Sequence, residues 1–209
     1  MWAIVKANQV ISVHSSIPSE LFTGEKRYDQ KHLSSLTETE KQNIGLYPVT
    51  LAAEPDSKYH TISAVKYSFA DKKVTQSYSF NDKNLDDVNL VDSDKKPILD
   101  SDGVQVVQKG LKTICKENVQ KTAHSMISLY SWLAERKTFS NTAIPSAVST
   151  YVAAVRTAAN SMATEIDKVS SISDLKLLFI DTYNDKGEKT ATAVMNDWPS
   201  DKDVKSYVR

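Results

Sequence analysis

Residues 104–137 read VQVVQKGLKTICKENVQKTAHSMISLYSWLAERK and decide the fold of the second half of the chain. No proline interrupts this stretch, and its apolar residues recur at steps of three and four, as on one face of an α-helix. The apolar positions are Val107, Leu111, Ile114, Cys115, Val119, Ala123, Met126, Tyr130 and Leu133. The pattern predicts one long helix, with Gly110 as a weak point that is expected to break the helix or delay its start.

A second helix is predicted to begin at Pro145, because proline suits the first helical position. Its apolar stripe consists of Val148, Tyr151, Val152, Val155, Ala158, Ala159, Met162, Ile166 and Val169. A third, shorter helix is predicted to start near Ser171 or Ser173. The narrow stripe of the long helix needs a cover, and the 145–170 helix supplies it as an antiparallel hairpin. Packing of the stripe against other copies of the chain stays open as an alternative.

The first 80 residues have the pattern of strands and loops. In residues 64–80, AVKYSFADKKVTQSYSF, aromatic and aliphatic residues alternate with small, hydroxylic and charged ones, which predicts a hairpin with one aromatic face. A second hairpin is predicted from residues 2–6 and 10–14. A short helix is predicted to begin with a capping box, either at Ser35 with Glu38 or two residues later, and to end before Gly45. Residues 15–34 are expected to be irregular.

A change of character separates the two halves. Residues 81–103 carry seven aspartates and scattered apolar residues with no clean period, which predicts a surface linker. The predicted fold is therefore α+β, with a small β-rich N-terminal domain (1–80), an acidic linker (81–103) and a helical-hairpin C-terminal domain (104–209).

The composition excludes several classes of protein. Lys plus Arg equals Asp plus Glu at 26 each, so the chain has no electrostatic footprint for nucleic acid or an anionic membrane surface. No apolar run approaches the roughly 18 residues of a membrane span. The first residues lack the features of a secretory signal, and the single cysteine, Cys115, excludes an intramolecular disulfide.

The sequence contains no pattern that predicts an enzyme, a cofactor site or a metal site. The four histidines have no metal-ligand spacing, and Cys115 has no histidine at contact spacing on its helix. The runs at 92–94 and 100–103 resemble fragments of a calcium loop but lack its later ligands. A polysaccharide hydrolase would need paired carboxylates in a cleft, and the linker aspartates are poor candidates for that role.

Several motifs of the second half resemble, in their order and spacing, a module of bacteriophage tail-fibre proteins and their assembly chaperones. They are WLAERK at 132–137, Ile144-Pro145, the stretch from Tyr151 to Arg156, and Trp198-Pro199. The resemblance covers roughly residues 120–200. The pieces MWAIVK at 1–6 and IGLYPV at 44–49 are similar to the openings of small structural proteins of marine tailed phages.

This resemblance implies a non-enzymatic tail component that acts in the virion by protein–protein binding, after synthesis in the host cytoplasm. The alternative is a tail-fibre assembly chaperone that acts in the infected cell and is not part of the particle. The implied partners are tail or tail-fibre proteins, and self-association stays open. The candidate partner-binding residues are Trp132, Arg136, Tyr151, Arg156, Trp198 and Pro199. Trp198 is expected to dock on its own domain or on a partner.

Overall fold

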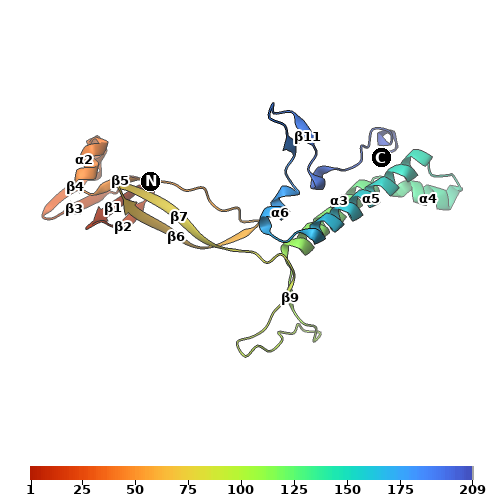
Figure 1. Ribbon diagram of the computed structural model, residues 1–209, viewed down its shortest axis with the longest axis horizontal. Coiled ribbons are helices and arrows are strands. Elements are labelled where there is room, and N and C mark those ends of the chain that lie inside the picture. The colour runs from red at the N-terminus through yellow and green to blue at the C-terminus, as the bar shows by residue number, and fades with distance from the viewer. Residues whose placement is uncertain (209) are drawn as a thin grey trace. The chain divides into compact units, whose positions relative to one another are not determined.

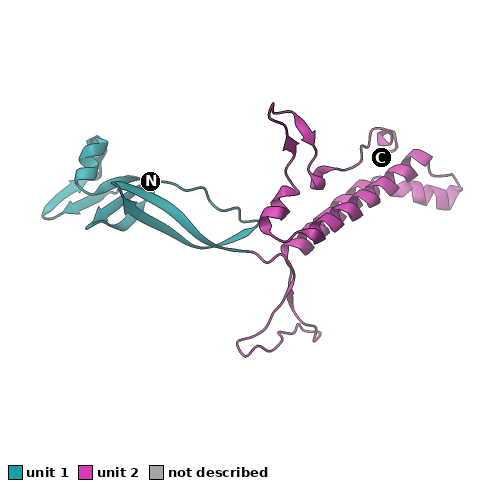
Figure 2. Ribbon diagram, in the orientation of Figure 1, with its two compact units in different colours: residues 1–82 teal, residues 83–209 magenta. Residues whose placement is uncertain are grey.

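Figure 1 shows the computed structural model of the chain, which describes residues 1–208. Arg209, the last residue of the predicted helical domain, lies outside the described residues. The chain divides into two compact units, residues 1–82 and 83–209 (Figure 2). The first is rich in strands and the second in helices, so the predicted α+β class is confirmed. No described helix is both long and apolar enough to cross a membrane.

The first unit is built on a five-stranded sheet with the order β2-β1-β5-β7-β6. These strands are β1 (Trp2–Lys6), β2 (Gln9–His14), β5 (Leu46–Thr50), β6 (His60–Ala70) and β7 (Lys73–Asp82). Neighbouring strands are antiparallel except β5 and β7, which are parallel. The edge strands β2 and β6 also contact each other, so the sheet curls towards closure.

Both predicted hairpins are confirmed. In the β6–β7 pair, Phe69 lies opposite Val74 and Tyr67 opposite Gln76. This is the face predicted to be aromatic, and near the turn it forms a core with Ala3, Val5 and Val74 at its centre. Beyond Thr75, the structure pairs β7 with β6 alone, so the far half of this hairpin is a two-stranded ribbon.

Residues 15–34, which were expected to be irregular, contain regular structure, so that expectation is wrong. They hold β3 (Glu20–Thr23), β4 (Lys26–Asp29) and most of α1 (Gln30–Ser35), ahead of α2 (Glu38–Asn43). The reason is packing, because Leu21, Tyr28, Leu33 and Leu46 form a second core of this unit.

The capping box at the start of α2 is the later of the two predicted alternatives. The Thr37 backbone N–H donates to Glu40 Oε2 at 2.8 Å, and the Glu40 N–H donates to Thr37 Oγ1 at 3.3 Å. Ser35 instead belongs to α1, where its hydroxyl donates to the His32 carbonyl. Gly45 follows α2 with a φ of 83°, as predicted.

The second unit contains α3 (Leu111–Ser128), α4 (Ser131–Ser140), α5 (Ser146–Lys168) and α6 (Ile172–Leu177). Helices α3 and α5 of one chain pack against each other, which confirms the predicted hairpin. Its interior contains residues of both predicted stripes, among them Cys115, Val119, Val155 and Met162. The third helix is also confirmed, with Ser171 as its N-cap accepting from the Asp174 N–H at 3.0 Å.

The helix predicted from 104 to 137 starts only after Gly110, the position expected to break or delay its start, and its continuity in the middle is wrong. Residues 107–108 belong to a strand, and the helix begins at Leu111. It then breaks at Tyr130, whose φ of −111° and ψ of 3° separate α3 from α4. The break lets the chain turn while Tyr130 stays buried in the core of the unit.

Residues 84–110 form a projecting element that we call the arm. Its stem pairs β8 (Val88–Asn89) with β9 (Val107–Gln108), and two further bridges join Val91 to Pro97 and Leu99 to Gln105. The linker prediction did not include this hydrogen-bonded structure.

The base of the arm caps the start of α3. The Leu111 and Lys112 N–H groups donate to the carbonyls of Asn84 and Leu85, both at 2.9 Å. The Gly110 N–H donates to Asp87 Oδ1 at 2.7 Å, and this bond is the main cause that lowers the pKa of Asp87. The Asp87 carboxylate therefore accepts a hydrogen bond from the N-cap residue of α3, although it lies 23 residues earlier in the sequence.

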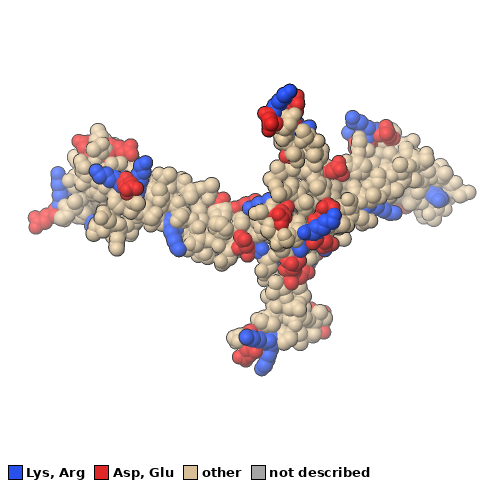
Figure 3. All heavy atoms as spheres, in the orientation of Figure 1, with Lys and Arg blue, Asp and Glu red and all other residues tan. Residues whose placement is uncertain are grey.

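The rest of the second unit is a C-terminal segment with little regular structure. It contains β10 (Thr182–Tyr183), β11 (Lys189–Ala191) and two short 3-10 helices, η1 (Val194–Asn196) and η2 (Lys205–Tyr207). Acidic and basic side chains are interspersed over the visible face of each unit (Figure 3).

Candidate functional site

The predicted partner-binding residues come together in the second unit, where α4, α5 and the C-terminal segment meet. The centre of this region is a buried cluster of Ala123, Tyr130, Leu133, Val148, Tyr151, Val155 and Val204. Trp132, Trp198 and Tyr207 are partly buried and pack against it. Residues far apart in the sequence therefore share one core.

An aromatic pair lies at the centre of the cluster. The rings of Tyr130 and Tyr151 meet edge to face, with centroids 5.6 Å apart and an interplanar angle of 71°. Burial is the main cause that raises the pKa of both phenols, and nearby Asp201 raises both further. The Tyr130 hydroxyl is buried without a hydrogen-bond partner.

Trp132 fastens the C-terminal segment to α4. Its indole Nε1–H donates to the Tyr207 carbonyl at 3.0 Å. The Arg136 guanidinium lies 5.1 Å from the Trp132 ring centroid, within the range of a cation–π contact. Arg136 Nη2 also donates to the Ala143 carbonyl at 3.4 Å, which connects α4 to the following loop. Both residues therefore hold the site together from within.

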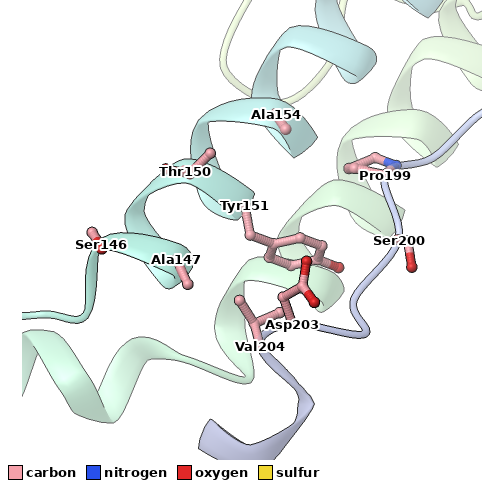
Figure 4. Close-up of a pocket in the computed structure, with 9 residues that line it drawn as sticks. All are labelled: Ser146, Ala147, Thr150, Tyr151, Ala154, Pro199, Ser200, Asp203 and Val204. Atoms are coloured by element: carbon pink, nitrogen blue, oxygen red, sulfur yellow. The ribbon is translucent and has the colours of Figure 1, made fainter.

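Trp198 packs against the core of its own unit, which is the first of its two predicted positions. Pro199 follows it and lines a surface groove of about 370 Å³ between the start of α5 and residues 199–204. We call this the Pro199 groove. Figure 4 shows Tyr151 reaching from α5 towards Asp203 and Val204 of the C-terminal segment. The groove also carries the hydroxyls of Ser146, Thr150 and Ser200, and Asp203 is the charged residue of its lining.

A second groove, of about 340 Å³, is bounded by the α3–α4 break and by α5. We call it the Arg156 groove. Its lining is largely apolar, with Ile127, Ile144, Val148 and Val152, and its charged residue is Arg156. Arg156 is exposed, so its charge is available at the surface.

The two grooves share a core but differ in charge. Tyr130 lines the Arg156 groove and Tyr151 lines the Pro199 groove, so the aromatic pair supports both. An apolar surface with a few well-placed polar groups is typical of sites that bind side chains or small ligands. Of the predicted site residues, Tyr151, Arg156 and Pro199 line the grooves, whereas Trp132, Arg136 and Trp198 support them.

Outside the grooves, His60 Nδ1 lies 2.9 Å from Asp82 Oδ1 in the first unit. Cys115 is buried in α3, and His124 is exposed on the same helix. Among residues 1–208, no group of three or more His, Cys, Asp or Glu side chains is arranged to hold a metal ion.

The sequence did not reveal the polar lining of the Pro199 groove. Ser146, Thr150 and Asp203 are ordinary surface residue types, and no periodicity brings positions near 150 together with positions near 203. Comparison with known proteins adds no relative, since no protein-family model, curated protein or solved structure matches the chain.

Proposed function

We propose that the protein is a non-enzymatic bacteriophage tail component that acts in the virion by binding other tail or tail-fibre proteins. The resemblance of residues 132–137, 144–145, 151–156 and 198–199 to the tail-fibre module supports this proposal. The observation that carries it is the pair of grooves with opposite charges, supported by one packed core.

The mechanism is recognition by a preformed surface. A partner places apolar side chains against Ile144 and Val152, with a carboxylate opposite Arg156. A basic group of the same partner lies opposite Asp203 in the Pro199 groove. Because packing already fixes both groove walls, little ordering entropy is lost on binding. Charges at such positions contribute mainly to specificity and to the association rate.

Protein analysis of purified phage particles tests where the protein acts. A tail component is found in the particle at a fixed copy number relative to the other tail proteins. If the protein is abundant in infected cells but missing from purified particles, the assembly-chaperone alternative replaces this proposal.

A charge reversal tests the role of the grooves. We expect Arg156→Glu to weaken binding to the purified tail-fibre protein at least about tenfold, because it places like charges at the contact. Lys121→Glu is the matched control, since Lys121 is exposed on α3 and lines neither groove. Equal effects of the two substitutions would show that net charge, and not the Arg156 groove, determines binding.

A further inference from the structure

The arm contains an internal repeat of eight residues. Residues 89–96 read NLVDSDKK, residues 97–104 read PILDSDGV, and a third copy begins as QVVQKG at 105–110. Each copy has two aliphatic residues at its second and third positions, and the first two copies continue with Asp-Ser-Asp. The sequence therefore predicts three equivalent segments.

The backbone hydrogen bonds follow this repeat. The N–H of Leu90 donates to the Val106 carbonyl at 2.9 Å, Val106 donates to Ile98 at 2.8 Å, and Ile98 donates to Leu90 at 3.0 Å. These residues occupy the same position in successive copies, so the three bonds form a closed triangle. The stem and two hairpins, with bridges at 91–97 and 99–105, meet at this triangle. The arm is thus a three-way junction with approximate threefold symmetry.

The turns of the two outer hairpins also match. Asp92 Oδ1 accepts from the N–H groups of Asp94 and Lys96, each at 2.9 Å. Asp100 Oδ1 accepts in the same way from Asp102 at 3.0 Å and from Val104 at 2.9 Å. In the first two copies, the first Asp therefore closes the turn, and the second Asp is exposed at its tip.

The second aliphatic residue of each copy is exposed at an equivalent place, and it is more exposed than the first, of which only Ile98 is exposed, at 39%. The second aliphatic residues are Val91, Leu99 and Val107, which are 51%, 54% and 44% exposed. Successive side chains of a strand point to opposite faces, so these three share the face opposite Leu90, Ile98 and Val106. No residue from 84 to 109 is buried, and the junction is therefore a single layer with an uncovered apolar face.

We propose that this face of Val91, Leu99 and Val107 docks on an apolar patch of another protein that is bordered by Lys or Arg. The charge of the arm supports a basic border, because residues 91–105 carry four Asp and two Lys. Pairing of two arms is the weaker alternative, since two arms carry the same net negative charge and would repel each other. This proposal shares one premise with the proposed function, namely that the protein acts by binding other proteins.

A random 12-residue peptide library displayed on yeast tests the proposal with the full-length protein as bait. We expect the selected peptides to combine apolar residues with Lys or Arg, and their enrichment to fall at least about tenfold for the Val91→Ser/Leu99→Ser/Val107→Ser variant. The matched control is Phe139→Ser/Leu177→Ser/Ile180→Ser, which removes apolar residues that are 88%, 64% and 58% exposed in the same unit. The control is expected to keep the enrichment.

A second variant leaves the apolar face intact. Asp94→Lys/Asp102→Lys is expected to change the selected peptides from basic to acidic, because only the charge at the tips is reversed. Hydrogen exchange at the amides of Leu90, Ile98 and Val106 reports whether the junction remains folded in each variant. Peptides that bind equally to all variants, or that show no charge preference, would overturn the proposal. This result is independent of the protein analysis of phage particles.

Discussion

Lys95 and Gly103 show how one residue can set the strain of a turn. Both occupy the same position of the repeat in the arm, and both have left-handed backbones, with φ values of 62° and 77°. This conformation costs an ordinary L-residue roughly 1–2 kcal/mol, whereas glycine adopts it freely. The same fold therefore holds one strained turn and one relaxed turn.

We expect Lys95→Gly to stabilise its turn by about 0.5–1 kcal/mol, after the larger chain entropy of glycine is subtracted. Gly103→Ala is the converse change and is expected to cost about 1 kcal/mol from backbone strain, since no atom lies within 4 Å of the added methyl group. Hydrogen exchange of the turn amides measures both effects. If the turns are equivalent, Lys95→Gly raises the protection of its turn amides and Gly103→Ala lowers it. Equal protection of the turn amides in the two variants would contradict this equivalence.

The Tyr130–Tyr151 pair predicts how stability depends on alkaline pH. Because the folded pKa of each phenol is raised above its unfolded value of about 10, their contribution is complete below pH 10 and is lost as the pH rises through the folded pKa. We expect the melting temperature to fall as the pH rises above about 10, and to fall less for Tyr151→Phe. Tyr183→Phe, at an exposed position, is the control and is expected to retain the full pH dependence.

At the scale of elements, the stripes of α3, α4 and α5 form the core of the second unit. Leu133 is fully buried there, so we expect Leu133→Ala to cost about 2–5 kcal/mol through lost transfer energy and a cavity. Lys121→Ala, on the exposed face, is expected to cost less than about 0.5 kcal/mol. Denaturant melts measure both changes, and similar losses would mean that the stripe is not the core.

Lys112 is unsuitable as a control because it pairs with Asp86 at 3.0 Å.

Gly110 connects the arm to α3, and its role is steric. A Cβ at this position would collide with the backbone of Leu85 and Asp86 at the base of the arm. We therefore expect Gly110→Ala to cost roughly 1–3 kcal/mol by overpacking, and to increase hydrogen exchange at Leu111 and Lys112. Unchanged protection at those two amides would show that the arm does not cap α3.

Sequence periodicity predicted the helices and strands that bury one face. The helical stripes and the β6–β7 alternation were visible because each buries one face. The break at Tyr130 was not visible, because Met126, Tyr130 and Leu133 continue the helical spacing through it and only tertiary packing explains the interruption. The arm was missed for a different reason, since its period of eight matches neither a helix nor a strand and its order lies in backbone hydrogen bonds. The repeated Asp-Ser-Asp was the available signal.

At the scale of the whole molecule, positive and negative side chains are equal in number. Net charge therefore cannot direct the binding of a partner, and binding depends on local surface features. The grooves and the arm both belong to the second unit, and each combines apolar surface with a few charges. The three apolar side chains of the arm and the two carboxylates at its tips make a small contact by themselves, but several weak contacts on one assembly add through effective concentration. Binding at more than one place is thus consistent with a component of a larger particle.

The mass of the purified protein in solution, alone and mixed with the tail-fibre protein of the same phage, tests the central claim most directly. We predict a complex of higher mass in the mixture, at a defined ratio, that Arg156→Glu weakens and Lys121→Glu does not. If the mixture shows only the masses of the separate proteins at micromolar concentrations, the protein does not act by binding the tail fibre, and the proposed function is contradicted.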